Sequence, residues 1–254
     1  MYDLLARYYD LTHDRLTADI GLILSLAARL PTPVVELGCG TGRLLLPLAR
    51  ARHTVLGVDN SAAMLARARS RLAQEPAEVA QRVTLLAADM VHLELPRRAG
   101  LVIIPYNTLL HLEPLRHLPA VLKHVRRHLL PQGQLFIDLP NPFFIAATPD
   151  EPLLALENVV TDPESGELIL QQAASRVDTH RQILEITWIY DRSPATGGPV
   201  TRDVIPMTYH YLFPHEVQRQ LGAAGLQQVG QYGSYSLAPF DEESERLLIV
   251  AEPV

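Results

Sequence analysis

The sequence predicts an α/β fold in which helices cover both faces of a doubly wound, seven-stranded sheet. Roughly the first 140 residues alternate short apolar runs with longer segments of helical apolar spacing, a pattern typical of a parallel sheet covered by helices. After Pro142 the pattern changes to alternating segments rich in β-branched and aromatic residues. We therefore expect an antiparallel β insert after the fifth strand, followed by elements that complete the sheet.

Local signals place the core elements along the chain. Pro31 ends the first predicted helix, and Ser61 caps a later one because its hydroxyl accepts from free N–H groups at a helix start. Pro131 and Gly133 stop the helix before the fifth strand, and Gly225 ends the last helix. The predicted helices span residues 16–30, 43–52, 61–72, 114–130 and 214–224. The predicted core strands span residues 34–37, 54–58, 82–86, 101–104, 134–139, 227–232 and 246–251.

The insert is defined by strands separated by turn signals. Residues 163–166 (PESG) and 196–199 (TGGP) combine the residue types that favour turns. The segments with strand character are 159–160, 167–175, 182–190 and 204–211. Residues 141–144 (NPFF) are expected to form a loop at the entrance to the insert. The predicted divisions are a core with an N-terminal lid at 1–142, the insert at 143–212, and a segment at 213–254 that completes the sheet.

Composition limits the classes of partner. The formal charge is −6 and the pI is near 5.9, which argues against a nucleic-acid substrate because phosphate binding needs a basic surface. The single cysteine, Cys39, excludes an intramolecular disulfide. The N-terminus lacks the charged-then-apolar order of a signal peptide, and the apolar stretches are too short to span a bilayer. We expect a cytoplasmic protein with no membrane partner.

A glycine-rich loop follows the first strand, at residues 36–42 (ELGCGTG). Glycines at this strand end let the backbone pass close beneath a ligand. The next helix points its N-terminus at such a ligand. Loops of this kind bind many nucleotides, so the glycines alone do not select one ligand.

Three acidic residues make the loop more specific. Glu36 stands two residues before the first glycine, where a carboxylate suits a ligand with an ammonium group. Asp59 ends the second strand, where a carboxylate can accept hydrogen bonds from both ribose hydroxyls. Asp89 follows the third strand. Each aspartate alone is equally well explained as a turn or cap carboxylate, but all three motifs in this order are not.

These ordered motifs resemble class I S-adenosylmethionine-dependent methyltransferases of the small-molecule type, which have a Rossmann-like fold. The resemblance covers roughly the first 140 residues and implies S-adenosylmethionine as the cofactor. It implies that Gly38 and Gly40 line the methionine part, that Asp59 holds the ribose, and that Asp89 accepts from the adenine amino group beside the Met90 backbone. The expected cofactor-binding residues are Glu36, Gly38, Cys39, Gly40, Asp59, Asn60, Met64, Asp89, Met90, Tyr106 and Asn107.

Two other functions compete with this interpretation. A NAD-dependent oxidoreductase is the first, but that fold favours G-x-G-x-x-G, whereas the spacing here is G-x-G-x-G with a preceding acid. A non-catalytic module that binds S-adenosylmethionine is the second. Cys39 has no visible activating neighbour, so we interpret it as a small loop residue rather than a nucleophile.

The acceptor side is expected after the fourth strand, at residues 104–112 (IPYNTLLHL). This loop leaves the sheet at its carboxyl edge, where ligands bind in open α/β folds. Asn107 and His111 are the candidate polar groups, and a neutral His111 imidazole can take a proton near pH 7. The alternative for His111 is a surface or cap histidine.

The N-terminal run at residues 5–11 (LARYYDL) resembles the opening of amino-sugar N-methyltransferases. In that group a tyrosine of this segment folds over the active site, and a histidine after the fourth strand lies near the amine. The resemblance implies catalytic roles for Tyr9 and His111. Tyr8 is the alternative to Tyr9, and an aromatic packing anchor is the alternative to a lid. The sugar substrate is not carried over.

No metal site is predicted. The remaining histidines of the first half of the chain are expected on exposed helix faces or turns; they are His53, His92, His117, His124 and His128. We therefore expect a methyl group to move from S-adenosylmethionine to a nitrogen or oxygen of a small-molecule acceptor. The β insert would wall the acceptor pocket or form a homodimer contact.

Overall fold

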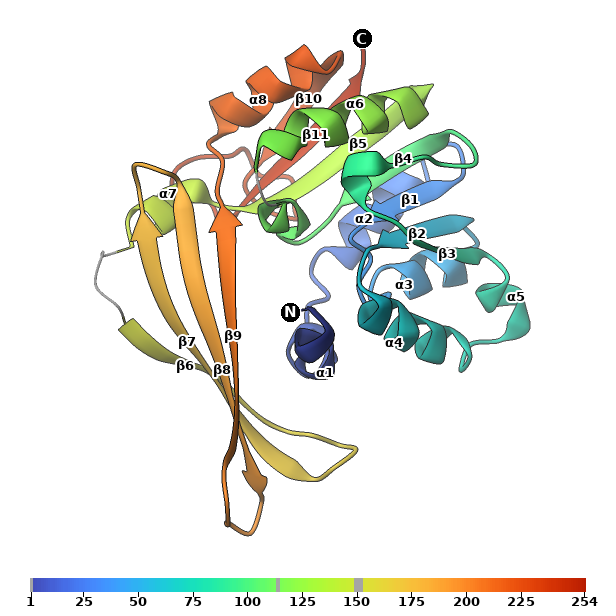
Figure 1. Cartoon of the computed structure of the whole chain (residues 1–254). Coiled ribbons are helices and arrows are strands. Elements are labelled where there is room, and N and C mark those ends of the chain that lie inside the picture. Colours follow the sequence, from blue (N-terminus) through green and yellow to red (C-terminus); the bar gives the residue numbers. More distant parts are fainter. Residues whose placement is uncertain (1, 113–114, 149–152) are drawn as a thin grey trace.

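A seven-stranded sheet forms the centre of the computed structural model, which describes residues 2–112, 115–148 and 153–254 (Figure 1). The strand order is β10-β11-β5-β4-β1-β2-β3. Five strands, from β1 to β5, run parallel, and β11 is antiparallel to both of its neighbours. The strand bounds are β1 Val34–Leu37, β2 Val55–Asp59, β3 Val83–Ala87, β4 Ala99–Ile104, β5 Leu129–Pro140, β10 Leu226–Tyr232 and β11 Arg246–Pro253.

Helices cover both faces of this sheet, as predicted. Alternate strand residues point to opposite faces, so Val35 belongs to the apolar cluster that includes α6 and α8, while Val34 belongs to the one that includes α2 and α3. Strands β1 and β4 are buried along their whole length, as parallel strands between two helix layers must be. The helix bounds are α2 Ile20–Ala27, α3 Leu45–Arg50, α4 Ala62–Leu72, α5 Ala77–Ala80, α6 Leu118–His128 and α8 Pro214–Ala223. Three short 3₁₀ turns are η1 Met90–His92, η2 Thr108–His111 and η3 Leu115–His117. The predicted start of the helix at Pro114 lies outside the described residues.

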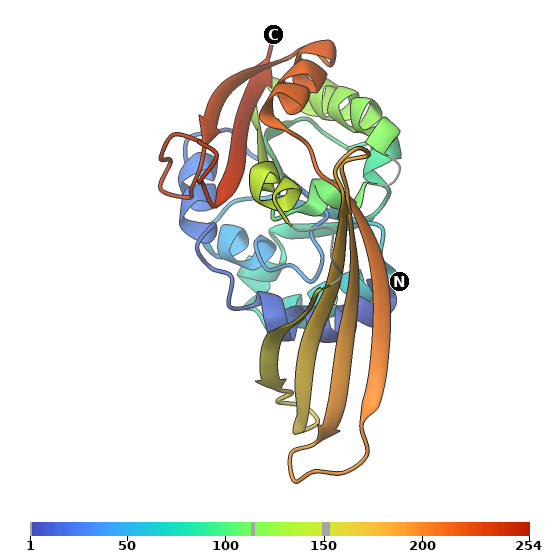
Figure 2. The same cartoon turned by 90° about the vertical axis from the view of Figure 1, so that its left-hand side faces the viewer.

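The insert is a separate four-stranded antiparallel sheet in the order β6-β7-β8-β9. This sheet is long and curved, and it projects away from the core (Figures 1 and 2). Its strands are β6 Leu153–Thr161, β7 Glu167–Asp178, β8 Ile183–Pro194 and β9 Thr201–His210. These strands are longer than the sequence predicted, because pairing continues through polar residues next to the turns.

The N-terminal segment is a helix, α1 Tyr2–His13, which lies between the insert and α4 (Figure 1). Its inward residues follow the i, i+3, i+4 spacing of one helix face: Leu5, Tyr8 and Tyr9. Tyr8 is fully buried and stacks on Tyr190 of β8, with ring centroids 3.9 Å apart. Its hydroxyl donates to the Asp203 carboxylate on β9. The Tyr8 hydroxyl and ring therefore fix α1 to the insert.

Three sequence-based expectations were wrong. Pro131 and Gly133 do not stop the helix before the fifth strand, because α6 ends at His128 and β5 already pairs with β4 at Leu129. Residues 141–144 do not form a loop but begin a short helix, α7 Pro142–Ala146, because the Asn141 side chain accepts from the Phe143 N–H at 3.0 Å and caps it. His128 is not on an exposed face but is buried, and its Nε2 accepts from the Leu95 N–H at 3.1 Å.

Within the described part of the chain, no helix is both long and apolar enough to cross a membrane. The cytoplasmic location stays a prediction from the sequence.

The packing of Tyr8 predicts a graded loss of stability. Tyr8→Phe removes the hydrogen bond and should lower the free energy of unfolding by about 1 kcal/mol. Tyr8→Ala also removes the buried ring and should lower it by about 3–5 kcal/mol. Denaturant titration measures both values. Leu4→Ala is the control, since Leu4 lies on the same helix and is 42% exposed. Equal losses for Leu4→Ala and Tyr8→Ala would contradict the packing role.

Candidate active site

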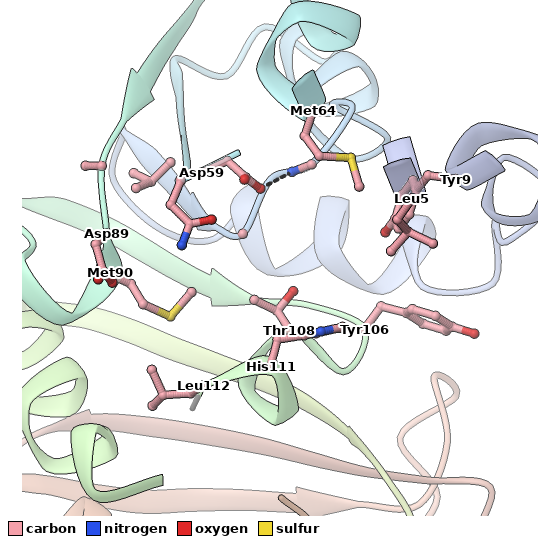
Figure 3. A pocket seen from close by; sticks show the side chains of 15 residues that line it. Leu5, Tyr9, Asp59, Met64, Asp89, Met90, Tyr106, Thr108, His111 and Leu112 are labelled. Atoms are coloured by element: carbon pink, nitrogen blue, oxygen red, sulfur yellow. Dashed lines mark hydrogen bonds between the residues drawn. The ribbon is translucent and has the colours of Figure 1, made fainter. Parts of the chain in front are cut away.

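A cavity lies at the carboxyl edge of the parallel strands, where the loops after β1, β2, β3 and β4 meet α1 (Figure 3). We call it the first cavity. Its lining residues are Leu5, Tyr9, Gly38, Gly40, Val58, Asp59, Asn60, Met64, Ala88, Asp89, Met90, Tyr106, Thr108, His111 and Leu112. Most of the residues predicted to bind the cofactor are therefore brought together. Glu36 and Cys39 are buried and Asn107 is half-buried, and these three are not part of this lining.

The glycine-rich loop has a backbone that only glycine adopts readily. Gly38 and Gly40 have φ values of 73° and 54°. A Cβ on Gly38 would lie 2.3 Å from Cγ2 of Thr108, so this loop and the loop after β4 are in direct contact. The absence of side chains at both glycines leaves their backbone open to the first cavity.

Asp59 holds the glycine loop in place. Its Oδ2 accepts from the Gly40 N–H at 2.8 Å, and its Oδ1 accepts from the Ser61 N–H at 2.8 Å. Burial raises the pKa of this carboxyl, and the backbone hydrogen bonds oppose that rise. Each carboxylate oxygen retains a second lone pair, so Asp59 can also accept from a ligand in the cavity. Asp89 is similar, since its Oδ1 caps η1 by accepting from the Val91 N–H at 2.9 Å and the residue lines the cavity.

The surroundings of Glu36 show whether the site can accommodate the positively charged end of the cofactor. Its side chain is buried, and its Oε2 has no hydrogen-bond partner within the described residues. Burial raises the pKa of Glu36 well above its usual value, and the charge of Arg43 opposes that rise. Arg43 does not pair with Glu36, because its guanidinium binds both oxygens of Asp19 at 2.7 and 2.5 Å. A buried carboxylate oxygen without a partner fits a cationic ammonium group such as that of the methionine part.

The loop after β4 is held by a buried ion pair that the sequence did not reveal. Asp138 of β5 accepts from the Arg246 guanidinium of β11 at 2.6 and 2.8 Å. Arg246 also donates to Oδ1 of Asn107 at 2.7 Å. Tyr106 and Asn107 have φ values of 36° and 65°, a costly conformation for residues other than glycine. The ion pair therefore fixes a strained loop at the edge of the first cavity.

A second cavity of about 460 Å³ lies between α1, the loop after β4 and the insert. Its lining residues are Leu5, Tyr9, Thr12, His13, Leu16, Tyr106, Asn107, Leu110, His111, Pro140, Ile145, Glu157, Asn158, Gln171, Leu184, Ile186, Trp188, Tyr190 and Tyr209. Four residues, Leu5, Tyr9, Tyr106 and His111, line both cavities. The two cavities therefore adjoin at the residues predicted to be catalytic.

Aromatic contacts orient the side chains at this junction. Tyr9 stacks on His13 with ring centroids 4.0 Å apart, and His111 packs edge-on against Tyr209 at 4.8 Å. Burial lowers the pKa of His111 to about 4 and also lowers the pKa of His13. Both imidazoles are therefore neutral at pH 7. Burial raises the pKa of Tyr9, so its phenol is protonated there.

Among the residues of the second cavity that sequence reasoning missed are two ring side chains, His13 and Trp188. His13 stands at the end of α1, which was not predicted as a helix. Trp188 reaches the cavity only because the insert folds back over α1. Cys39 is buried, and burial raises the pKa of its thiol, which agrees with a packing role. Within the described ranges, no group of histidine, cysteine or acidic side chains could hold a metal ion.

Comparison with known proteins identifies the family. Residues 34–133 match the model of a methyltransferase domain. That range contains the glycine loop, Asp59, Asp89 and the loop after β4. The chain therefore contains a methyltransferase domain, in the segment whose motifs resemble class I S-adenosylmethionine-dependent enzymes. Its cofactor is S-adenosylmethionine.

Relatives of this methyltransferase match over different lengths. The chain is 25% identical over 96% of its length to cypemycin N-terminal methyltransferase of a Streptomyces species, of which it covers 94%. It is 31% identical over 53% of its length to the dTDP-3-amino-3,6-dideoxy-alpha-D-glucopyranose N,N-dimethyltransferase of Streptomyces fradiae, of which it covers 52%. The fold is similar to that of the CcbJ methyltransferase from Streptomyces caelestis, with a TM-score of 0.79 and 24% identity over 93% of this chain and 94% of that one.

The unpaired Glu36 carboxylate predicts opposite effects on affinity and stability. Glu36→Gln should weaken S-adenosylmethionine binding about 10- to 100-fold, because a charge-assisted hydrogen bond is lost. The same change should stabilise the ligand-free protein at neutral pH. The pKa of Glu36 is higher in the folded than in the unfolded protein, so the folded state loses stability as pH rises through the unfolded-state pKa. Glutamine does not ionise and therefore avoids this loss.

Calorimetric titration measures the affinity, and denaturant titration from pH 4 to pH 8 measures the stability. Glu94→Gln is the control, because Glu94 is exposed and lines neither cavity. Unchanged affinity for S-adenosylmethionine in Glu36→Gln would rule out the ammonium contact.

Proposed function

We propose that this enzyme transfers a methyl group from S-adenosylmethionine to an amine nitrogen of a small molecule held in the second cavity. The observation that supports this most is the shared wall of the two cavities at Tyr9, Tyr106 and His111. The amine lone pair forms the N–CH3 bond as the S–CH3 bond of S-adenosylmethionine breaks. S-adenosylhomocysteine leaves, and the N-methylammonium product gives up its proton to solvent. The names of two relatives, an N-terminal methyltransferase and an N,N-dimethyltransferase, support nitrogen rather than oxygen as the acceptor atom.

The second cavity suits a small-molecule acceptor. Its volume of about 460 Å³ is within the usual range for small-ligand pockets. Aromatic side chains in its lining would reduce contact between the amine and water, which solvates the amine and lowers its nucleophilicity. An open pocket beside the cofactor residues favours a catalytic protein over the non-catalytic binding module. The NAD-dependent oxidoreductase has no such support.

We assign His111 to orienting the acceptor amine. Its pKa of about 4 keeps the imidazole neutral, so the ring can accept a hydrogen bond from the amine N–H and direct the nitrogen lone pair. The same low pKa makes His111 a poor store for the proton of an alkylammonium ion. The acceptor therefore has to bind as the free amine. Tyr9, from α1, would cover the place where the two cavities meet. Its protonated phenol could donate a hydrogen bond to a polar atom of a bound ligand.

This assignment predicts a particular pH profile. The wild-type rate should rise between pH 6 and pH 9 with the pKa of the acceptor amine and show no step from His111 titration. His111→Ala should lower kcat about 10- to 100-fold, and His111→Asn should recover part of it because an amide oxygen can accept the same hydrogen bond. Steady-state rates with an accepted amine measure this. An unchanged kcat in His111→Ala would remove the role.

The insert, residues 143–212 in the division proposed above, would serve as the acceptor wall on one face and as a homodimer contact on the other. On the outer face of the sheet, register places Leu156 of β6, Ile189 of β8 and Val204 of β9 in one row, with Gln172 of β7 between Leu156 and Ile189. Leu156 and Val204 are 60% and 51% exposed. Exposed large apolar side chains gathered on one face, as here, are typical of protein interfaces.

The dimer proposal predicts a mass in solution of twice the 28.2 kDa of one chain. Leu156→Lys should shift the protein toward the monomer, because it places a charge inside the apolar contact. Light scattering coupled to gel filtration measures the mass. Leu237→Lys is the control, because Leu237 is 39% exposed and lies between β10 and β11, outside the insert. A monomeric wild-type protein would contradict the proposal.

A further inference from the structure

The charge of the second cavity restricts the acceptor further. Among its described lining residues, Glu157 of β6 carries the only formal charge, because His13 and His111 are neutral at pH 7. No lysine or arginine lines either cavity in the described part of the chain. The sequence at positions 1, 113–114 and 149–152 (M, EP and PDEP) contains no basic residue that could change this.

Two arginines that lie against the junction residue Tyr106 are already paired with carboxylates. Arg43 and Arg246 lie against the Tyr106 ring, with guanidinium carbons 5.9 and 5.0 Å from its centroid. Arg43 binds both oxygens of Asp19, and Arg246 binds Asp138. Breaking either pair would leave a buried carboxylate without its partner, at a cost of several kcal/mol.

A third arginine, Arg192, lies further along β8 from the cavity residue Tyr190. It pairs with Glu167 at 3.2 Å and with Asp203 at 3.5 Å. These three arginines of the described residues are therefore engaged by carboxylates and are not available to an anion in the second cavity.

The cavity instead has the features of a site for cations and neutral polar groups. Phosphates are usually bound by arginine, lysine or a helix N-terminus, and a buried phosphate without such partners is strongly unfavourable. Aromatic faces attract ammonium groups. The aromatic residues of the lining are Tyr9, Tyr106, Trp188, Tyr190 and Tyr209.

The end of the cavity formed by the insert carries fixed polar groups beside the carboxylate. Asn158 follows Glu157 on β6, and its side-chain N–H donates to Oε1 of Gln171 on β7 at 2.8 Å. Gln171 in turn donates to the Tyr190 hydroxyl at 3.4 Å. None of these insert residues lines the first cavity, so this end lies away from the cofactor site.

Resting on the proposed function, we propose that the acceptor is an amine that carries no phosphate group. Its amine lies at the junction with the first cavity, and Glu157 binds a second cationic or hydroxyl group of the same molecule at the insert end. An amino sugar linked to a nucleoside diphosphate, as in the name of one relative, is thereby disfavoured.

A matched pair of probes tests this directly. One is dTDP-3-amino-3,6-dideoxyglucose, and the other is the methyl glycoside of the same amino sugar, which lacks the diphosphate. Calorimetry with the full chain saturated with S-adenosylhomocysteine measures binding of each probe without turnover. We expect the methyl glycoside to bind at least about tenfold more tightly. Equal or tighter binding of the dTDP-sugar, or no binding of either probe at millimolar concentration, would overturn the inference.

Charge reversal at Glu157 tests the residue itself. Glu157→Lys should reduce the ratio of the two probes' affinities, methyl glycoside over dTDP-sugar, about tenfold. The variant places a cation where the carboxylate stood. Glu164→Lys is the matched control, since Glu164 is exposed in the turn between β6 and β7 and does not line the cavity. An equal effect of the two variants would overturn the role of Glu157.

Turnover with S-adenosylmethionine separates the two proposals. If the methyl glycoside binds but its nitrogen is not methylated, the proposed function fails and the charge preference stands. If the dTDP-sugar binds more tightly and is N-methylated, the proposed function stands and the charge inference fails.

Discussion

The contact between α1 and the insert is the interaction on which the active site depends. The buried Tyr8 ring stacks on Tyr190, and its hydroxyl binds Asp203, so helix and insert form one wall. The next residue, Tyr9, lies on the same inward side of α1 and lines both cavities. Without this contact the first cavity would lose its cover and the second cavity would lose one side. The two adjacent tyrosines thus have different roles: Tyr8 fixes the helix to the insert, and Tyr9 faces the cavities.

Buried charges complete the geometry. Asp19 with Arg43, and Asp138 with Arg246, are paired beneath the loops that face the ligands. Such pairs add little net stability, but they hold strained backbone such as that at Asn107 in one conformation. Glu36 differs from them because one of its oxygens has no partner among the described residues. The free energy lost in burying that oxygen is recovered when a cationic ligand binds, which links the cost of folding to affinity for the cofactor.

The fold and most of the lining of the first cavity were predictable from the sequence, because their signals are local. The glycine loop, Asp59 and Asp89 each stand at the end of a short strand, and the order of parallel strands brings those ends together. The acceptor side was only partly predictable. Trp188 and His13 reach the second cavity through the packing of α1 on the insert, which no local pattern encodes. The pairing of Asp138 with Arg246 depends on β5 and β11 being neighbours, although they are far apart in sequence.

The central claim is that methyl transfer occurs where the two cavities meet. The most direct measurement is a crystal structure with S-adenosylhomocysteine and an amine that the enzyme methylates. The account predicts the cofactor sulfur in the first cavity near Gly38 and Gly40, and the amine nitrogen in the second cavity, facing that sulfur between Tyr9 and His111. An amine bound outside the second cavity, or one whose nitrogen is separated from the sulfur by Tyr9 or His111, would contradict it.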